Sequence, residues 1–170
     1  IDYDKKAETS ILFFKTVQNK MHYAVTGHTA PELVYLRADC TKPFMGLTSF
    51  KGNKPQKTDI ANAKNYLSES ELKELNAITS AYLDFAELQA LRRKTMTMRE
   101  WVNKLDDFLQ MSDSEVLQNA GTISHKMALA KAGEEYSKYK KQNIDELSQV
   151  EKDFIESAKK VQKMLESKKN

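Results

Sequence analysis

The 170-residue sequence has few of the residues that interrupt helices, with five glycines and three prolines. The last of them is Gly133, so neither residue type occurs over 134–170. A low content of glycine and proline favours long helices over many short strands. No apolar run approaches the roughly 18–20 residues that a membrane-spanning helix needs. There is no recognisable signal peptide either, and we therefore expect no membrane partner.

Cysteine is almost absent as well. Cys40 is the single one, which excludes an internal disulfide and fits a cytoplasmic protein. Neither sign of charge is in strong excess, because 27 basic and 24 acidic side chains leave a net charge of +3. That balance does not by itself indicate nucleic-acid binding. The chain has no glycine-rich phosphate loop, nucleophile elbow or cysteine cluster, so we predict no catalytic residue, metal ligand or cofactor.

The apolar pattern that is present predicts an all-α fold, an irregular bundle of several helices. Apolar side chains repeat at steps of three and four over residues 8–25, which marks one face of a helix. The same spacing covers more than half the circumference of a helix predicted over 69–92, which should therefore be central. Shorter helices are expected over 30–38 and 58–66.

Capping signals predict where these helices begin. A Ser or Thr followed three residues later by Glu forms a capping box, in which each side chain accepts a backbone N–H of the other residue. Four such pairs mark predicted helix starts: Thr29–Glu32, Ser68–Glu71, Thr97–Glu100 and Ser112–Glu115. The last pair predicts a short helix that ends near 120–121, and Thr58 with Asp59 should cap the helix over 58–66.

Residues 39–57 lack a helical period and form the one long loop that we predict. Its apolar side chains Phe44, Met45, Leu47 and Phe50 argue for an ordered loop that is pinned to the core.

We divide the chain into a helical core, 1–123, and a long C-terminal helix, 124–170. That helix would extend beyond the core and mediate a homodimer, although a break near 142–143 stays open.

Five sequence blocks carry a resemblance to a known family. They are FFKTVQNKMHYAVTGHTAPEL (13–33), ADCTKPFMGLTSFKG (38–52), AKNYLSESELKELNAITSAYLDFAELQA (63–90), MTMREWVNKLDDFLQ (96–110) and AGTISHKMA (120–128). Together they resemble the C-terminal region of the RhuM family of virulence-associated proteins. The resemblance implies a DNA-binding N-terminal domain before this region and a virulence role on a mobile element. Because the chain opens at Ile1, we expect that domain to be missing, and DNA contact to occur through it.

Two groups of residues form the predicted ligand or partner surface. One is the turn between the first two helices, where two imidazoles and a carboxylate are close in sequence. The other is the distal, basic half of the loop, where an aromatic ring beside lysines could stack on bases. The complete set is His22, Tyr23, His28, Thr29, Glu32, Phe50, Lys51, Lys54 and Lys57.

The sequence therefore favours a non-enzymatic helical module for interaction or oligomerisation in a DNA-binding, virulence-associated protein. Two alternatives stay open. One is a metal-dependent nuclease or hydrolase that uses His22, His28 and Glu32, since two imidazoles and a carboxylate can hold a metal ion. The other is direct nucleic-acid binding through the basic segment 51–64, whose lysines could neutralise phosphates.

Overall fold

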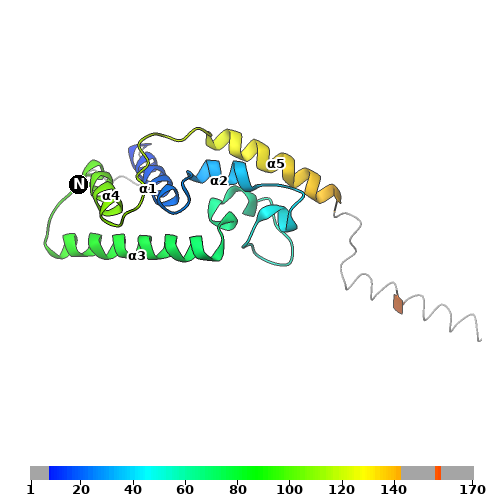
Figure 1. Cartoon of the computed structure of the whole chain (residues 1–170), viewed down its shortest axis with the longest axis horizontal. Coiled ribbons are helices and arrows are strands. Elements are labelled where there is room, and N and C mark those ends of the chain that lie inside the picture. The colour runs from blue at the N-terminus through cyan, green and yellow to red at the C-terminus, as the bar shows by residue number, and fades with distance from the viewer. Residues whose placement is uncertain (1–7, 143–155, 158–170) are drawn as a thin grey trace, which may run out of the picture. The chain divides into compact units, whose positions relative to one another are not determined.

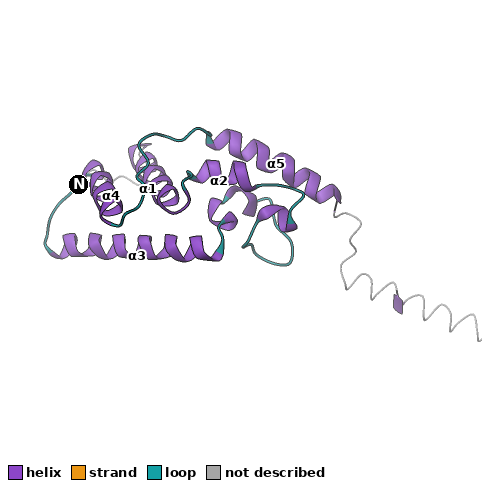
Figure 2. Ribbon diagram, in the orientation of Figure 1, coloured by secondary structure: helices purple, strands orange, loops and turns teal. Residues whose placement is uncertain are grey.

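The computed structural model describes residues 8–142 and 156–157. Its described elements are helices, joined by loops and three 3-10 turns (Figures 1 and 2). The α-helices are α1 (Glu8–Thr26), α2 (Ala30–Arg37), α3 (Glu69–Leu91), α4 (Met98–Met111) and α5 (His125–Gln142). No strand occurs among these residues, which confirms the all-α prediction.

Contacts divide the chain into two compact units, 1–136 and 137–170. Of the second unit, only 137–142 and 156–157 are described. The predicted extension of the last helix to the C-terminus falls mostly outside the described residues, as does the dimer contact expected there. None of the described helices is long and apolar enough to cross a membrane.

Helices α1, α3 and α4 pack against one another in the first unit, and α3 passes beneath α4 and α1 in the view of Figure 1. The ring of Tyr82 on α3 lies between Phe85 and the α4 rings of Trp101 and Phe108, at centroid distances of 5.8–6.3 Å. Its hydroxyl donates to the Trp101 carbonyl oxygen at 2.6 Å. Leu105, on the same α4 face, is fully buried. Aromatic packing with a satisfied hydroxyl thus joins the two helices.

Three capping boxes start helices as predicted. Thr29, Ser68 and Thr97 each accept the backbone N–H of the glutamate three residues later, and that glutamate accepts the cap's own N–H. The short helix predicted after Ser112 is wrong. The Ser112 N–H donates to the carbonyl oxygens of Phe108 and Leu109, so this residue ends α4 and is not available to begin another helix.

The helix predicted over 58–66 is also incorrect in type. The chain forms two 3-10 turns there, Asp59–Ala61 and Ala63–Tyr66, separated by Asn62 in an extended conformation. Thr58 has helical dihedral angles and its side chain makes no capping bond. An N-cap needs extended backbone, which Asn62 provides, and its side chain accepts the Lys64 N–H.

The loop over 39–57 is pinned to the core, chiefly by Met45 and Leu47, which are buried. Phe44, Met45 and Gly46 all have positive φ angles of 51°, 52° and 83°. Non-glycine residues adopt this conformation only where their surroundings hold them. Here the Asp39 N–H donates to the Met45 carbonyl oxygen at 3.2 Å, which closes the turn. The anchoring of the loop therefore follows from its apolar residues.

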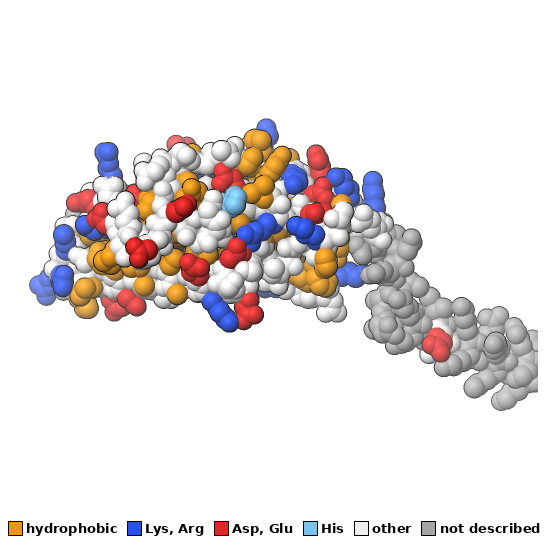
Figure 3. All heavy atoms as spheres, viewed as in Figure 1, with side chains coloured by type: hydrophobic (Ala, Val, Ile, Leu, Met, Phe, Trp, Pro, Cys, Tyr) orange, Lys and Arg blue, Asp and Glu red, His pale blue; other side chains and the backbone are white. Residues whose placement is uncertain are grey.

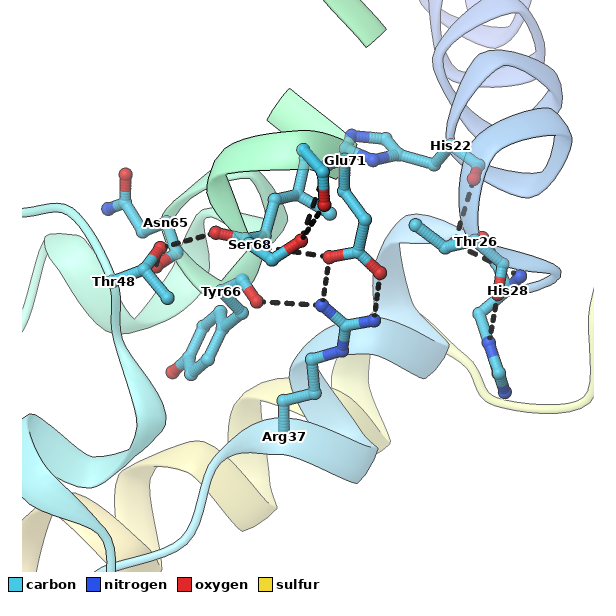
Figure 4. A network of polar contacts seen from close by, with 11 residues as sticks. His22, Thr26, His28, Arg37, Thr48, Asn65, Tyr66, Ser68 and Glu71 are labelled. Atoms are coloured by element: carbon cyan, nitrogen blue, oxygen red, sulfur yellow. Dashed lines mark hydrogen bonds and ion pairs between the residues drawn. The ribbon is translucent and has the colours of Figure 1, made fainter. Parts of the chain in front are cut away.

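Arg37 at the end of α2 connects this helix to the start of α3 (Figure 4). Its guanidinium donates two hydrogen bonds of 2.6 Å to the Glu71 carboxylate and one of 2.8 Å to the Tyr66 carbonyl oxygen. These guanidinium hydrogen bonds, together with those from Ser68, outweigh burial and lower the pKa of Glu71 to about 2. Glu71 thus takes part both in the ion pair with Arg37 and in the capping box of α3.

We predict that Arg37→Lys lowers the free energy of unfolding by about 1 kcal/mol, because an ammonium group cannot make the paired, planar contact of a guanidinium. Urea denaturation measures the effect. The matched control is Lys73→Arg, since Lys73 forms an exposed pair with Glu69 within one helix and should change stability by less than about 0.5 kcal/mol. Equal effects of the two substitutions would contradict the structural role of Arg37.

Candidate functional site

The predicted site residues of the turn between α1 and α2 face two different cavities. His28, Glu32 and Tyr23 line a cavity of about 400 Å³ together with Gly121 and Thr122 of the segment before α5. His22 lines another cavity, of about 410 Å³. Figure 4 shows the His22 and His28 rings pointing in different directions from the turn. The three groups proposed for a metal or for acid–base chemistry are therefore not brought together.

Glu32 is almost fully buried and its carboxylate is used by hydrogen bonds. It accepts the Thr29 N–H at 2.8 Å, and from Thr122 it accepts the N–H at 2.6 Å and the hydroxyl at 2.8 Å. Burial alone would raise the pKa of Glu32, but the hydrogen bonds from Thr122 and Thr29 lower it to about 2. A carboxylate held in this way is a poor proton acceptor near neutral pH. Its role is to fix the segment before α5 to the start of α2.

The two imidazoles differ in environment. Nδ1 of His28 lies 2.8 Å from the Thr26 carbonyl oxygen, so this ring stabilises the turn after α1. His22 is half-buried, as His28 is, and its buried Nδ1 has no hydrogen-bond partner among the described residues. Burial, with the nearby charge of Lys64, lowers the pKa of His22 to about 4. His22 is therefore neutral at pH 7.

The basic half of the loop forms a separate surface. Lys51, Lys54 and Lys57 are exposed, and none is in an ion pair within the described part of the chain. The Phe50 ring packs against Phe44, with centroids 4.9 Å apart, so one of its faces is already in contact with an aromatic ring. None of these residues lines either cavity at the turn.

One group of possible metal ligands was not predicted from the sequence. Asp39, Cys40 and Glu135 place their ligand atoms within 4.8 Å of one another, and this is the one such set in the described residues. The carboxylates of Asp39 and Glu135 already accept hydrogen bonds within the protein. Glu135 accepts the Cys40 N–H at 2.9 Å, and Asp39 accepts the N–H and hydroxyl of Thr41. The arrangement ties α5 to the loop, a contact between residues 95 positions apart that no local sequence signal indicates.

A groove between α1, α3 and the start of α4 also escaped the sequence analysis. It encloses about 490 Å³, and its lining contains no charged residue. The lining is Phe13, Phe14, Val17, Gln18, Met21, Thr79, Tyr82, Leu83, Ala86, Met96, Met98 and Trp101. Phe14 and Leu83 at its edges are 51% and 62% exposed. The apolar spacing over 8–25 and 69–92 predicts buried helix faces, but α1 and α3 leave part of their apolar surface uncovered.

The fold and these sites define an all-helical protein in which the polar turn between α1 and α2 is held by internal hydrogen bonds and an apolar groove lies open between α1 and α3. The chain belongs to the Virulence protein RhuM family, whose model matches residues 1–147. This match confirms the family resemblance and extends it at both ends. No curated protein and no solved structure matches the chain.

Proposed function

We propose that this chain is a non-enzymatic interaction module of a virulence-associated protein and that it forms a homodimer through the apolar groove between α1 and α3. The observation that carries the proposal is the groove's composition. Its lining residues are almost all apolar, and the exposed Phe14 and Leu83 stand at its edges. Exposed apolar patches of this kind, within a charged surface, typically mark protein contacts. On the face of the molecule drawn in Figure 3, basic and acidic side chains are scattered between apolar ones.

A second copy is the partner that fits these features. The same face offers both a hollow and side chains that protrude beside it, as a two-fold interface requires. Each copy could then place Phe14 and Leu83 against the groove of the other. Since the lining carries no charge, the approach of two copies involves no repulsion between like charges within the groove.

The positions of the polar residues support a non-enzymatic role. The Glu32 carboxylate accepts three hydrogen bonds from Thr29 and Thr122, and His22 lies in a different cavity from His28. The alternative of a metal-dependent nuclease or hydrolase needs all three groups at one point. Direct nucleic-acid binding through 51–64, a cytoplasmic location and a dimer contact through the C-terminal helix remain predictions from the sequence.

We expect Phe14→Glu and Leu83→Glu each to weaken dimerisation by at least about 10-fold, because each places a charge in an apolar contact. Sedimentation equilibrium of the full chain measures the dissociation constant. Leu91→Glu is the matched control, since this leucine on α3 is 74% exposed and does not line the groove. It should leave the constant unchanged.

The same experiment separates the groove from the C-terminal segment. Phe154 belongs to the apolar pattern that predicts the last helix, and it lies outside the described residues. If Phe154→Glu abolished dimerisation while Phe14→Glu and Leu83→Glu had no effect, the groove would not be the interface. A wild-type chain that stays monomeric at high concentration would contradict self-association altogether.

A further inference from the structure

The cavity that contains His22 has a lining of unusual chemistry. It lies between α1, the start of α2, the two 3-10 turns and the start of α5, all within the first compact unit. Its volume of about 410 Å³ falls in the range of small-molecule sites. The polar lining consists of Lys15, Gln18, Asn19, His22, Asn62, Ser124 and His125, and no carboxylate lines it. With Lys15 in the lining and no carboxylate, the cavity favours an anionic ligand over a cationic one.

Several of these polar groups accept a backbone hydrogen bond through an oxygen atom and carry a donor as well. The side-chain oxygen of Asn19 accepts the Ala30 N–H, and that of Asn62 accepts the Lys64 N–H. The Ser124 hydroxyl oxygen accepts the Met127 N–H at 3.2 Å. Each asparagine has an amide NH₂ and the serine has a hydroxyl hydrogen, and these groups can donate to a ligand. These contacts hold the three side chains in place at the cavity wall.

The rest of the wall is apolar and supplies contact area. Pro31, Val34, Ala63, Ala128 and Leu129 contribute to it, and Val34, Ala63 and Ala128 are themselves buried. The His22 ring lies in the same wall, and its buried Nδ1 lacks a hydrogen-bond partner among the described residues. Buried polar atoms ordinarily have one. An apolar wall with a few placed donors is the usual form of a site for an organic ligand.

We infer that this cavity binds a small phosphate ester of about the size of a nucleoside monophosphate, with Lys15 and His125 beside the phosphate. The donors come from α1 and from the start of α5, and a phosphate offers them more acceptor oxygens than a carboxylate does. The apolar wall contacts the organic part. This site is independent of the proposed dimer groove, with which it shares only Gln18.

The test is isothermal titration of the full chain with adenosine monophosphate, with inorganic phosphate and with adenosine as separate ligands. Saturable 1:1 binding of the monophosphate is expected, at least about 10-fold tighter than that of inorganic phosphate or of adenosine. Lys15→Ala and His125→Ala should each weaken it by about 10-fold or more. Both side chains are exposed, so these substitutions leave the core intact.

Lys126→Ala provides the control. Lys126 is exposed and neighbours His125, yet it does not line the cavity, and its removal changes the net charge as Lys15→Ala does. The affinity of Lys126→Ala should equal that of the wild type. Absence of saturable binding by the monophosphate would overturn the inference. Equal losses in Lys15→Ala and Lys126→Ala would also overturn it, because they would show attraction to surface charge alone.

Discussion

Replacement of Gly121 by alanine is expected to lower the free energy of unfolding by about 3 kcal/mol, although the residue is not in a helix. Gly121 has φ = +81°, a conformation that costs an alanine about 1 kcal/mol. A Cβ added there would also lie 2.8 Å from Cγ2 and 2.9 Å from Oγ1 of Thr29, which is fully buried. Displacing this buried capping residue adds about 1–3 kcal/mol to the loss in free energy of unfolding. Urea denaturation at pH 7 measures the change.

Gly27→Ala separates the two contributions. Gly27 also has a positive φ, of 69°, but no atom lies within 4 Å of an added Cβ. The free energy of unfolding of this variant should fall only by the cost of the left-handed backbone conformation, about 1 kcal/mol. If Gly27→Ala and Gly121→Ala lost the same stability, the close packing of the segment before α5 on the start of α2 would be incorrect.

Replacement of Glu32 by glutamine should cost about 2–3 kcal/mol at pH 7. The neutral amide weakens the hydrogen bonds that the carboxylate accepts from Thr29 and Thr122, and charged hydrogen bonds are the stronger kind. Glu100→Gln is the matched control, because Glu100 holds the same capping-box position at the exposed start of α4. Its loss should not exceed about 1 kcal/mol.

The pH dependence of this difference provides a second readout. The pKa of Glu32 is about 2 in the folded protein and 4.5 for an ordinary glutamate, so the folded state favours the charged form. The stabilisation is complete above pH 4.5 and disappears as the pH falls toward 2. Wild type and Glu32→Gln should therefore converge in stability over that interval. A difference that stayed constant from pH 7 to pH 2 would show that the charge of Glu32 is not what stabilises the turn.

Local chemistry made part of this structure predictable. The boxes that begin at Thr29, Ser68 and Thr97 depend on residues three apart, so the sequence alone identifies the starts of α2, α3 and α4. Ser112 has the same spacing to Glu115 but does not cap a helix, because its N–H already ends α4. A capping-box spacing therefore does not begin a helix where its first residue already ends the preceding helix.

The candidate site was harder to predict because its contacts are distant in sequence. Glu32 was correctly recognised as a capping residue, but its bonds to Thr122 span 90 positions. His22 and His28 are close in sequence, yet the turn directs their rings to different cavities. The apolar groove was missed for a related reason. Periodicity marks a face as apolar, and only the arrangement of α1, α3 and α4 decides how much of that face is covered.

Site-specific photo-crosslinking of the full chain tests the proposed dimer through the groove most directly. Phe14 would be replaced by the photoreactive analogue benzoylphenylalanine, and Phe44, which is 44% exposed on the loop, by the same residue as a control. The account predicts a covalent dimer from position 14, with adducts on α1 or α3 of the partner copy, and little product from position 44. Exclusively monomeric product from position 14, or equal yields from both positions, would contradict it.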